Sequence, residues 1–392
     1  MSADATIETM NPQPLYDLSP VLRLALAAGA IALGPLSWVW LRHRQADPVG
    51  RLQALTLLTF FLTFDLVLFG AYTRLTDSGL GCPDWPGCYG TASPSAAAQQ
   101  INEAQAAMPT GPVTHVKAWI EMIHRYLAMA VGMLIVTLTA ATWWQRRRGT
   151  PVSPWWPVAT LAWVCVQGAF GAWTVTLKLT PAIVTLHLLG ALVLLALLCR
   201  QAVGYAQSQP GFRRPVVAPR TRTWIVAALL VLWLQVALGG WVSTNYAVLA
   251  CTEFPKCQGS WWPAMDFSQG FEFWRALGKT AAGENIGFAA LTAIHYVHRL
   301  WAAVTFAALV TLAWHLRKGA LRKQAQWIAI LLLWQLASGL SNVVLGWPLV
   351  AAVAHTGGAA ALVAVLTWAL CETRPLAVSA PGTRLREAEM SA

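Results

Sequence analysis

WIEMIHRY, at residues 119–126, and IHYVHRL, at residues 294–300, are the two stretches on which the interpretation of this sequence rests. Each opens a long apolar run. Each also places two ionisable side chains three residues apart, with an arginine directly after the second. Residues three apart lie on one face of a helix. Because ionisable groups inside a membrane helix are costly, they mark functional positions by default, and these two stretches become the first candidates for a site.

The composition around them is that of a polytopic membrane protein. Of 392 residues, 57% are hydrophobic and only 11% are charged, whereas a soluble domain carries about 25% charged residues. The net charge of +11 could suggest binding to nucleic acid. Its basic residues, however, gather in short connections between apolar runs, as membrane topology requires. The composition therefore predicts an all-α protein embedded in membrane lipid, with no nucleic-acid partner.

Nine apolar runs are long enough to cross a bilayer, since a span needs roughly 20 apolar residues. They cover residues 22–41, 53–73, 119–142, 155–176, 182–202, 223–243, 288–315, 326–345 and 349–371.

Basic residues follow the first, third, fifth and seventh runs. They are Arg42, Arg44, Arg51, Arg146, Arg147, Arg148, Arg213, Arg214, Arg220, Arg222, Arg317, Lys318, Arg322 and Lys323. By the positive-inside rule these alternate connections face the cytoplasm. The pattern predicts an N-terminus outside, a C-terminus inside, and a disordered cytoplasmic tail over residues 372–392.

An internal repeat links the two opening stretches. Its landmarks recur in the same order, 168 to 174 residues later. Cys82 and Cys88 recur as Cys251 and Cys257; Glu121, His124 and Arg125 recur as His295, His298 and Arg299; Gln167, Gly171 and His187 recur as Gln335, Gly339 and His355. The repeat predicts two pseudo-symmetric four-helix bundles, at 53–203 and 223–371, joined by a cytoplasmic linker at 204–222. Residues 1–52, with the first span, form an extension outside the repeat.

Two histidines in each four-helix unit are the strongest chemical signal. His124 and His187 in the first unit, and His298 and His355 in the second, all lie shortly after a span enters from the outer side. Facing histidines in a helical bundle are a common way to hold haem. For any single histidine, a hydrogen bond between helices is the ordinary alternative. Zinc would need four ligands, and no cysteine lies at this depth.

The two units differ at one position of the repeat, where the first has Glu121 and the second has His295. A carboxylate one turn from a haem-binding histidine could move protons or stabilise positive charge. We therefore expect Glu121 to be catalytic and His295 to support a neighbouring ligand. Arg125 and Arg299, directly after the ligand histidines, could pair with haem propionates or extend to the membrane interface.

The four outer cysteines form two close pairs, Cys82 with Cys88 and Cys251 with Cys257. An oxidising outer compartment favours disulfides, and each pair is expected to close on itself. The pairs could brace the loops or take part in redox chemistry or haem delivery. Asp65, a carboxylate within the second span, could serve a proton path or bond to a neighbouring helix.

A family resemblance emerges from these motifs together. The stretch GAYTRLTDSGL at 70–80, the following CPDWPGC at 82–88, and the EMIHR at 121–125 resemble haem A synthases of the bacterial type. The resemblance covers about residues 53–371. It implies oxidation of the C8 methyl of haem O to a formyl group, giving haem A for terminal oxidases. It also implies a bacterial inner-membrane location.

The resemblance assigns roles to the motif positions. His124 and His187 would flank the substrate haem, Glu121 would be the catalytic carboxylate, and His298 and His355 would bind a resident haem b. Arg74 joins the two other arginines as a candidate propionate contact. Candidate protein partners are a haem O synthase and oxidase assembly factors, while the electron donor or acceptor is left open.

Two other functions share much of this pattern. A dihaem electron carrier would hold the same haem at both sites and need no catalytic carboxylate. A haem transporter or chaperone would rely chiefly on the outer cysteines.

Overall fold

The computed structural model describes residues 19–209, 211–212, 215 and 217–373, and over these residues it is helical apart from loops and isolated β-bridges. Within them, nine helices are long and apolar enough to span a membrane. These are α1 (Ser19–Arg42), α2 (Pro48–Leu75), α4 (His115–Arg147), α5 (Trp155–Thr176), α6 (Pro181–Gln207), α7 (Pro219–Thr244), α9 (Phe288–Leu316), α10 (Arg322–Val344) and α11 (Leu349–Glu372). The prediction of nine spans is confirmed. The predicted tail lies almost wholly outside the described residues.

Several helices are longer than the apolar runs that predicted them. Helix α4 begins four residues before the predicted start at 119, because the Thr114 side chain caps it by accepting from the Lys117 amide at 3.3 Å. Helix α2 likewise begins at Pro48, behind an Asp47 cap that accepts from Val49 and Gly50. Hydropathy detects only the part of a helix that lies in lipid, so these polar first turns were missed.

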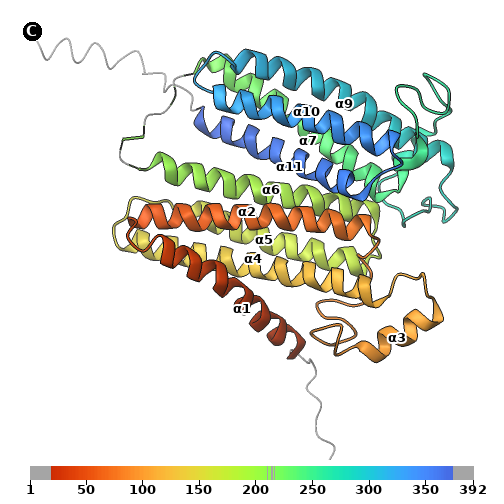
Figure 1. The fold of residues 1–392 in the computed structure, drawn as a ribbon, viewed down its shortest axis with the longest axis horizontal. Helices are drawn as coiled ribbons and strands as arrows, with labels where there is room; N and C mark the ends of the chain where they lie inside the picture. The colour runs from red at the N-terminus through yellow and green to blue at the C-terminus, as the bar shows by residue number, and fades with distance from the viewer. Residues whose placement is uncertain (1–18, 210, 213–214, 216, 374–392) are drawn as a thin grey trace, which may run out of the picture.

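The long helices pack side by side in two neighbouring groups (Figure 1). In the N-terminal group, α2 and α5 each pack against both α4 and α6. In the C-terminal group, α7 and α10 each pack against both α9 and α11. The groups meet where α11 contacts α2 and α6, and where α6 contacts α7. Most of the large apolar core lies along this contact and within the C-terminal group.

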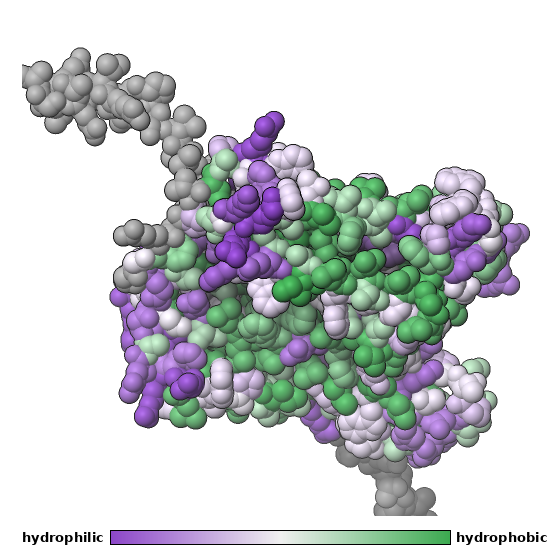
Figure 2. Space-filling view, turned by 45° about the horizontal axis from the view of Figure 1, so that its top comes forward, coloured by the Kyte–Doolittle hydropathy of each residue, from purple (hydrophilic) through white to green (hydrophobic). Residues whose placement is uncertain are grey.

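The two long connections between spans lie at the same end of the molecule, which we call the loop end (Figure 1). One connection contains α3 (Ala98–Ala107), and the other contains η1 (Ala247–Ala250) and α8 (Phe267–Gly270). Hydropathy did not predict these short helices. Figure 2 shows hydrophobic residues over the middle of the molecule and hydrophilic residues gathered at both ends, as a multi-pass membrane protein requires.

Helix α1 packs along α4 and α2, and its first turns reach the loop end. There the Leu24 side chain is fully buried in a cluster with Cys82, Cys88, Ile101 and Met122. The extra helix therefore supports the connection that carries the first cysteine pair.

Leu24→Ala should destabilise the protein, because removing a fully buried leucine side chain usually costs about 2–5 kcal/mol. Thermal unfolding in detergent measures the loss as a lowered Tm. The control is Leu26→Ala, whose side chain is 65% exposed in the same helix. Equal Tm values for the two variants would show that α1 does not brace the loop end.

Candidate functional site

In the N-terminal group, each predicted ligand histidine lies against a glycine of a neighbouring helix. His124 of α4 faces Gly70 of α2, where a Cβ atom would lie 3.1 Å from the imidazole Nε2. His187 of α6 faces Gly171 of α5, where a Cβ would lie 3.4 Å from Cε1. Helices α4 and α6 both pack against α2 and α5, so these two histidines belong to one helix group. The helix packing thus brings this predicted pair together.

The C-terminal group repeats the arrangement. His298 of α9 lies against Gly239 of α7, where a Cβ would lie 3.0 Å from Cε1. His355 of α11 lies against Gly339 of α10, with the corresponding distance 3.1 Å. Most Cβ contacts are longer than these two distances, so a side chain at either glycine would require the ring to shift by a few tenths of an ångström.

Polar side chains fix three of the four imidazole rings. The Gln167 side-chain amide lies 3.2 Å from His187 Nδ1. The Gln235 amide lies 3.2 Å from Nδ1 and 3.5 Å from Nε2 of His298. The Ser338 hydroxyl lies 3.0 Å from His355 Nδ1. A histidine that binds metal through Nε2 typically donates its Nδ1–H, and the Ser338 hydroxyl can accept that proton from His355.

His124 is held differently. Its ring stacks on Phe69 of α2, with centroids 6.3 Å apart and planes 9° from parallel. Over the described residues, no side chain hydrogen-bonds to this ring. The four histidine environments are therefore not equivalent.

Two histidines per helix group suit a metal that brings further ligands of its own, as haem iron does. In the described part of the chain, no three or more His, Cys, Asp or Glu side chains cluster as a bare metal ion would require. Paired, partly accessible imidazoles in an apolar setting instead fit a flat apolar group between them.

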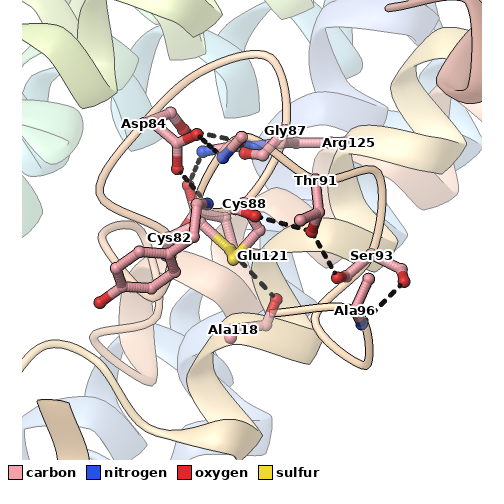
Figure 3. The surroundings of a disulfide bond; sticks show 12 residues. Cys82, Asp84, Gly87, Cys88, Thr91, Ser93, Ala96, Ala118, Glu121 and Arg125 are labelled. Atoms are coloured by element: carbon pink, nitrogen blue, oxygen red, sulfur yellow. Dashed lines mark hydrogen bonds and ion pairs between the residues drawn. A yellow bond between two sulfur atoms is a disulfide. The ribbon is translucent and has the colours of Figure 1, made fainter. Parts of the chain in front are cut away.

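Glu121 and Arg125 form a buried ion pair under the first disulfide loop, residues 82–88, which the Cys82–Cys88 bond closes (Figure 3). The Glu121 and Arg125 side chains are 2.5 Å apart. The second Glu121 oxygen accepts from the Cys82 amide at 2.8 Å. The guanidinium of Arg125 donates to the backbone carbonyls of Asp84, Pro86 and Gly87. This pair ties the loop to α4.

The second disulfide loop, residues 251–257, is tied to α9 in a related way. Arg299 donates to the carbonyls of Cys251 at 2.7 Å and Glu253 at 2.8 Å. Its Nε lies 3.2 Å from His295 Nε2, so His295 takes the place of Glu121 as the partner of the arginine. No carboxylate occupies this position in the C-terminal group.

The three arginines predicted as propionate contacts, Arg74, Arg125 and Arg299, all form hydrogen bonds with other residues of the protein. Arg125 and Arg299 bind the disulfide loops. Arg74 donates to the Ser243 carbonyl at 2.5 Å and stacks on the Tyr246 ring, 4.0 Å from its centroid. Partial burial raises the pKa of the Tyr246 phenol, which stays protonated and donates to Asp77 at 2.5 Å. Arg74 thus links the C-terminal ends of α2 and α7.

Sequence reasoning missed two features of the site. The glycines at 70 and 239 stand 169 residues apart, the same offset as the cysteine pairs, and that offset could have identified them. The repeat could not identify Gln235, because the residue 169 positions before it is Leu66.

Asp65, the carboxylate noted within the second span, lies on the exposed side of α2.

Comparisons with known proteins show the family to which the chain belongs. The model of the cytochrome oxidase assembly protein family, COX15-CtaA, matches residues 53–367. A heme A synthase from Shewanella oneidensis is 38% identical over 316 residues, which is 79% of this chain and 92% of that protein. A heme A synthase from Rhizorhabdus wittichii is 28% identical over 83% of this chain and 96% of its own length. One from Halalkalibacterium halodurans is 26% identical over 78% and 90%, respectively.

Arg125→Met should expose the first disulfide to reductant, because the loop loses its hydrogen bonds to a charged group. Such bonds contribute about 1.5–3 kcal/mol each, so we expect reduction by a water-soluble phosphine to be at least about tenfold faster. Thiol labelling over time measures the rate. Arg147→Met, at the other end of α4, is the control. If both variants are reduced at the same rate, Arg125 does not hold the loop.

Proposed function

Because the chain belongs to the cytochrome oxidase assembly protein family, we propose that it is a haem A synthase that oxidises the C8 methyl of haem O to a formyl group. One observation carries the proposal best. A buried carboxylate, Glu121, lies one helical turn from His124, where the other helix group has only His295. A protein that merely held two haems would have no need for this difference.

We infer that the N-terminal and C-terminal helix groups are two pseudo-symmetric units, at 53–203 and 223–371. Three matched features support this: the histidine-on-glycine contacts, the arginine-bound disulfide loops, and the equivalent packing of the helices. Residues 1–52, with α1, are an addition outside the family match, and 204–222 link the units.

The C-terminal unit would hold a resident haem b, with His298 and His355 as axial ligands. Two features support the fit. Glycines leave room for both rings, and Gln235 and Ser338 reach Nδ1 of His298 and His355. Haem b, when bound, supplies one-electron transfer between the substrate haem and an external donor or acceptor.

The N-terminal unit would take haem O as its substrate, between His124 and His187. The reaction would be two successive two-electron hydroxylations of the methyl carbon, each adding one oxygen atom, with either dioxygen or water plus an external electron acceptor as the oxidant. The resulting geminal diol loses water to give the aldehyde. Glu121 lies where it can stabilise developing positive charge or move a proton. Its pairing with Arg125 and the Cys82 amide holds this carboxylate in one orientation under the disulfide loop.

The proposed location is the bacterial inner membrane, with the loop end and the N-terminus on the periplasmic side. The arginine-rich connections at the opposite end support this orientation. A haem O synthase would supply the substrate haem O, and oxidase assembly factors would receive the product haem A.

The rival functions differ in what they require. A dihaem carrier would need matched sites, whereas Glu121 and His295 differ. A transporter or chaperone would use the cysteines for haem delivery, whereas both pairs are closed as disulfides with carbonyls bound by arginine.

Glu121→Gln should cause haem O to accumulate and should lower haem A formation by about 10²–10⁴-fold, because the carboxylate charge is lost. The amide can still accept from Cys82, so the loop should stay in place. Conversion is measured by mass analysis of extracted haems, with haem b content as the control for folding. Wild-type conversion in this variant would contradict the catalytic role of Glu121.

Gly239→Ala should lower the haem b content, because the added Cβ would lie 3.0 Å from the His298 ring and displace it. The low-spin haem b absorbance per protein measures the loss. The matched control is Gly168→Ala in α5, where a Cβ would meet nothing within 4 Å. Equal haem b content in the two variants would argue against a ligand role for His298 at this position.

A further inference from the structure

The polar partners of the four histidines differ in a way that the proposed reaction can use. In the C-terminal unit both rings have a partner at Nδ1, Gln235 for His298 and Ser338 for His355. In the N-terminal unit Gln167 reaches the His187 ring, at 3.2 Å. For His124, no hydrogen bond to the ring occurs within the residues that the structure describes.

The missing partner can be assigned to one position. Gln235 stands four residues before Gly239, the glycine under His298. Leu66 stands four residues before Gly70, the glycine under His124. Residues four apart share a helix face, so Leu66 occupies on α2 the place that Gln235 occupies on α7. Leu66 packs into an apolar cluster with α4 and α1, and offers no polar atom.

Gln235 is suited to hold a ligand histidine. Its Oε1 is buried and has no partner among the described residues. Amide nitrogen and oxygen are interchangeable by rotation, so Oε1 can instead accept a proton from His298 Nδ1. The amide also lies 3.5 Å from His298 Nε2, so this rotated bond to Nδ1 is the arrangement that leaves the Nε2 lone pair for iron. It would fix the ring and raise the basicity of the ligand.

We propose that Leu66 makes His124 the releasable ligand of the substrate haem, and that Gln235 makes His298 a permanent ligand of the resident haem. The inference rests on the proposed function, which requires one haem to enter and leave while the other stays. Leu66 and Gln235 act through the histidines, so both are positioning residues. Removing such a supporting bond typically weakens metal binding by about 10–100-fold.

Leu66→Gln tests the first half of the proposal. Purified protein loaded with haem O is mixed with excess apomyoglobin, and the haems that reach the acceptor are identified by mass over time. Release of haem O and haem A should slow by about 10–100-fold, while release of haem b is unchanged. Leu66→Met, which has a similar size and no strong hydrogen-bonding atom, should behave as wild type. Equal release from the two variants, with haem b retained, would overturn the proposal.

The Gln235 variants test the second half and do not depend on Leu66 variants folding. Gln235→Leu should release haem b about 10–100-fold faster than wild type, whereas Gln235→Glu, which keeps an acceptor oxygen, should retain it. Equal haem b release from these two variants would overturn the role of Gln235. Wild-type protein that takes up no haem O would contradict the proposed function instead, and the Gln235 pair would still report on ligand fixing.

Discussion

The close approach of helices at glycine is the contact on which this architecture depends. Four imidazole rings lie where a neighbouring helix has no side chain, with hypothetical Cβ distances of 3.0–3.4 Å. A larger residue at Gly70, Gly239 or Gly339, where these distances are 3.0–3.1 Å, would push the ring or the helix aside. Since the contacts join α2 to α4, α5 to α6, α7 to α9 and α10 to α11, they also fix the pairwise packing of the eight helices. Ligand placement and helix packing are thus one constraint in this protein.

Arginine applies a second constraint at the loop end. A guanidinium removed from water needs acceptors for its donors. The buried Arg125 and the half-buried Arg299 each find them in the backbone carbonyls of a disulfide loop. Another guanidinium nitrogen, Nη2 of Arg125 or Nε of Arg299, then meets the residue one turn earlier, which is Glu121 in one group and His295 in the other. Because Glu121 in one group corresponds to His295 in the other, only one of the two arginines has a carboxylate one helical turn before it. The asymmetry is local, and the scaffold around it is unchanged.

Much of this could be predicted from the sequence, because hydropathy and spacing act over short distances. The nine spans and the cysteine pairing follow from such patterns. The exact helix ends did not, since the caps at Asp47 and Thr114 lie outside the apolar runs. That the arginines meet haem propionates or extend to the membrane interface stays a prediction. Their use by loop carbonyls depends on tertiary folding, which spacing does not reveal. The support of the first disulfide loop by Leu24 was missed for the same reason.

The central claim is that one site alters a haem while the other retains one. Its most direct test is the identification by mass of the haems extracted from the purified wild-type protein, produced in cells that make haem O. The account predicts haem b together with haem O or haem A. Haem b alone, at both sites, would contradict it.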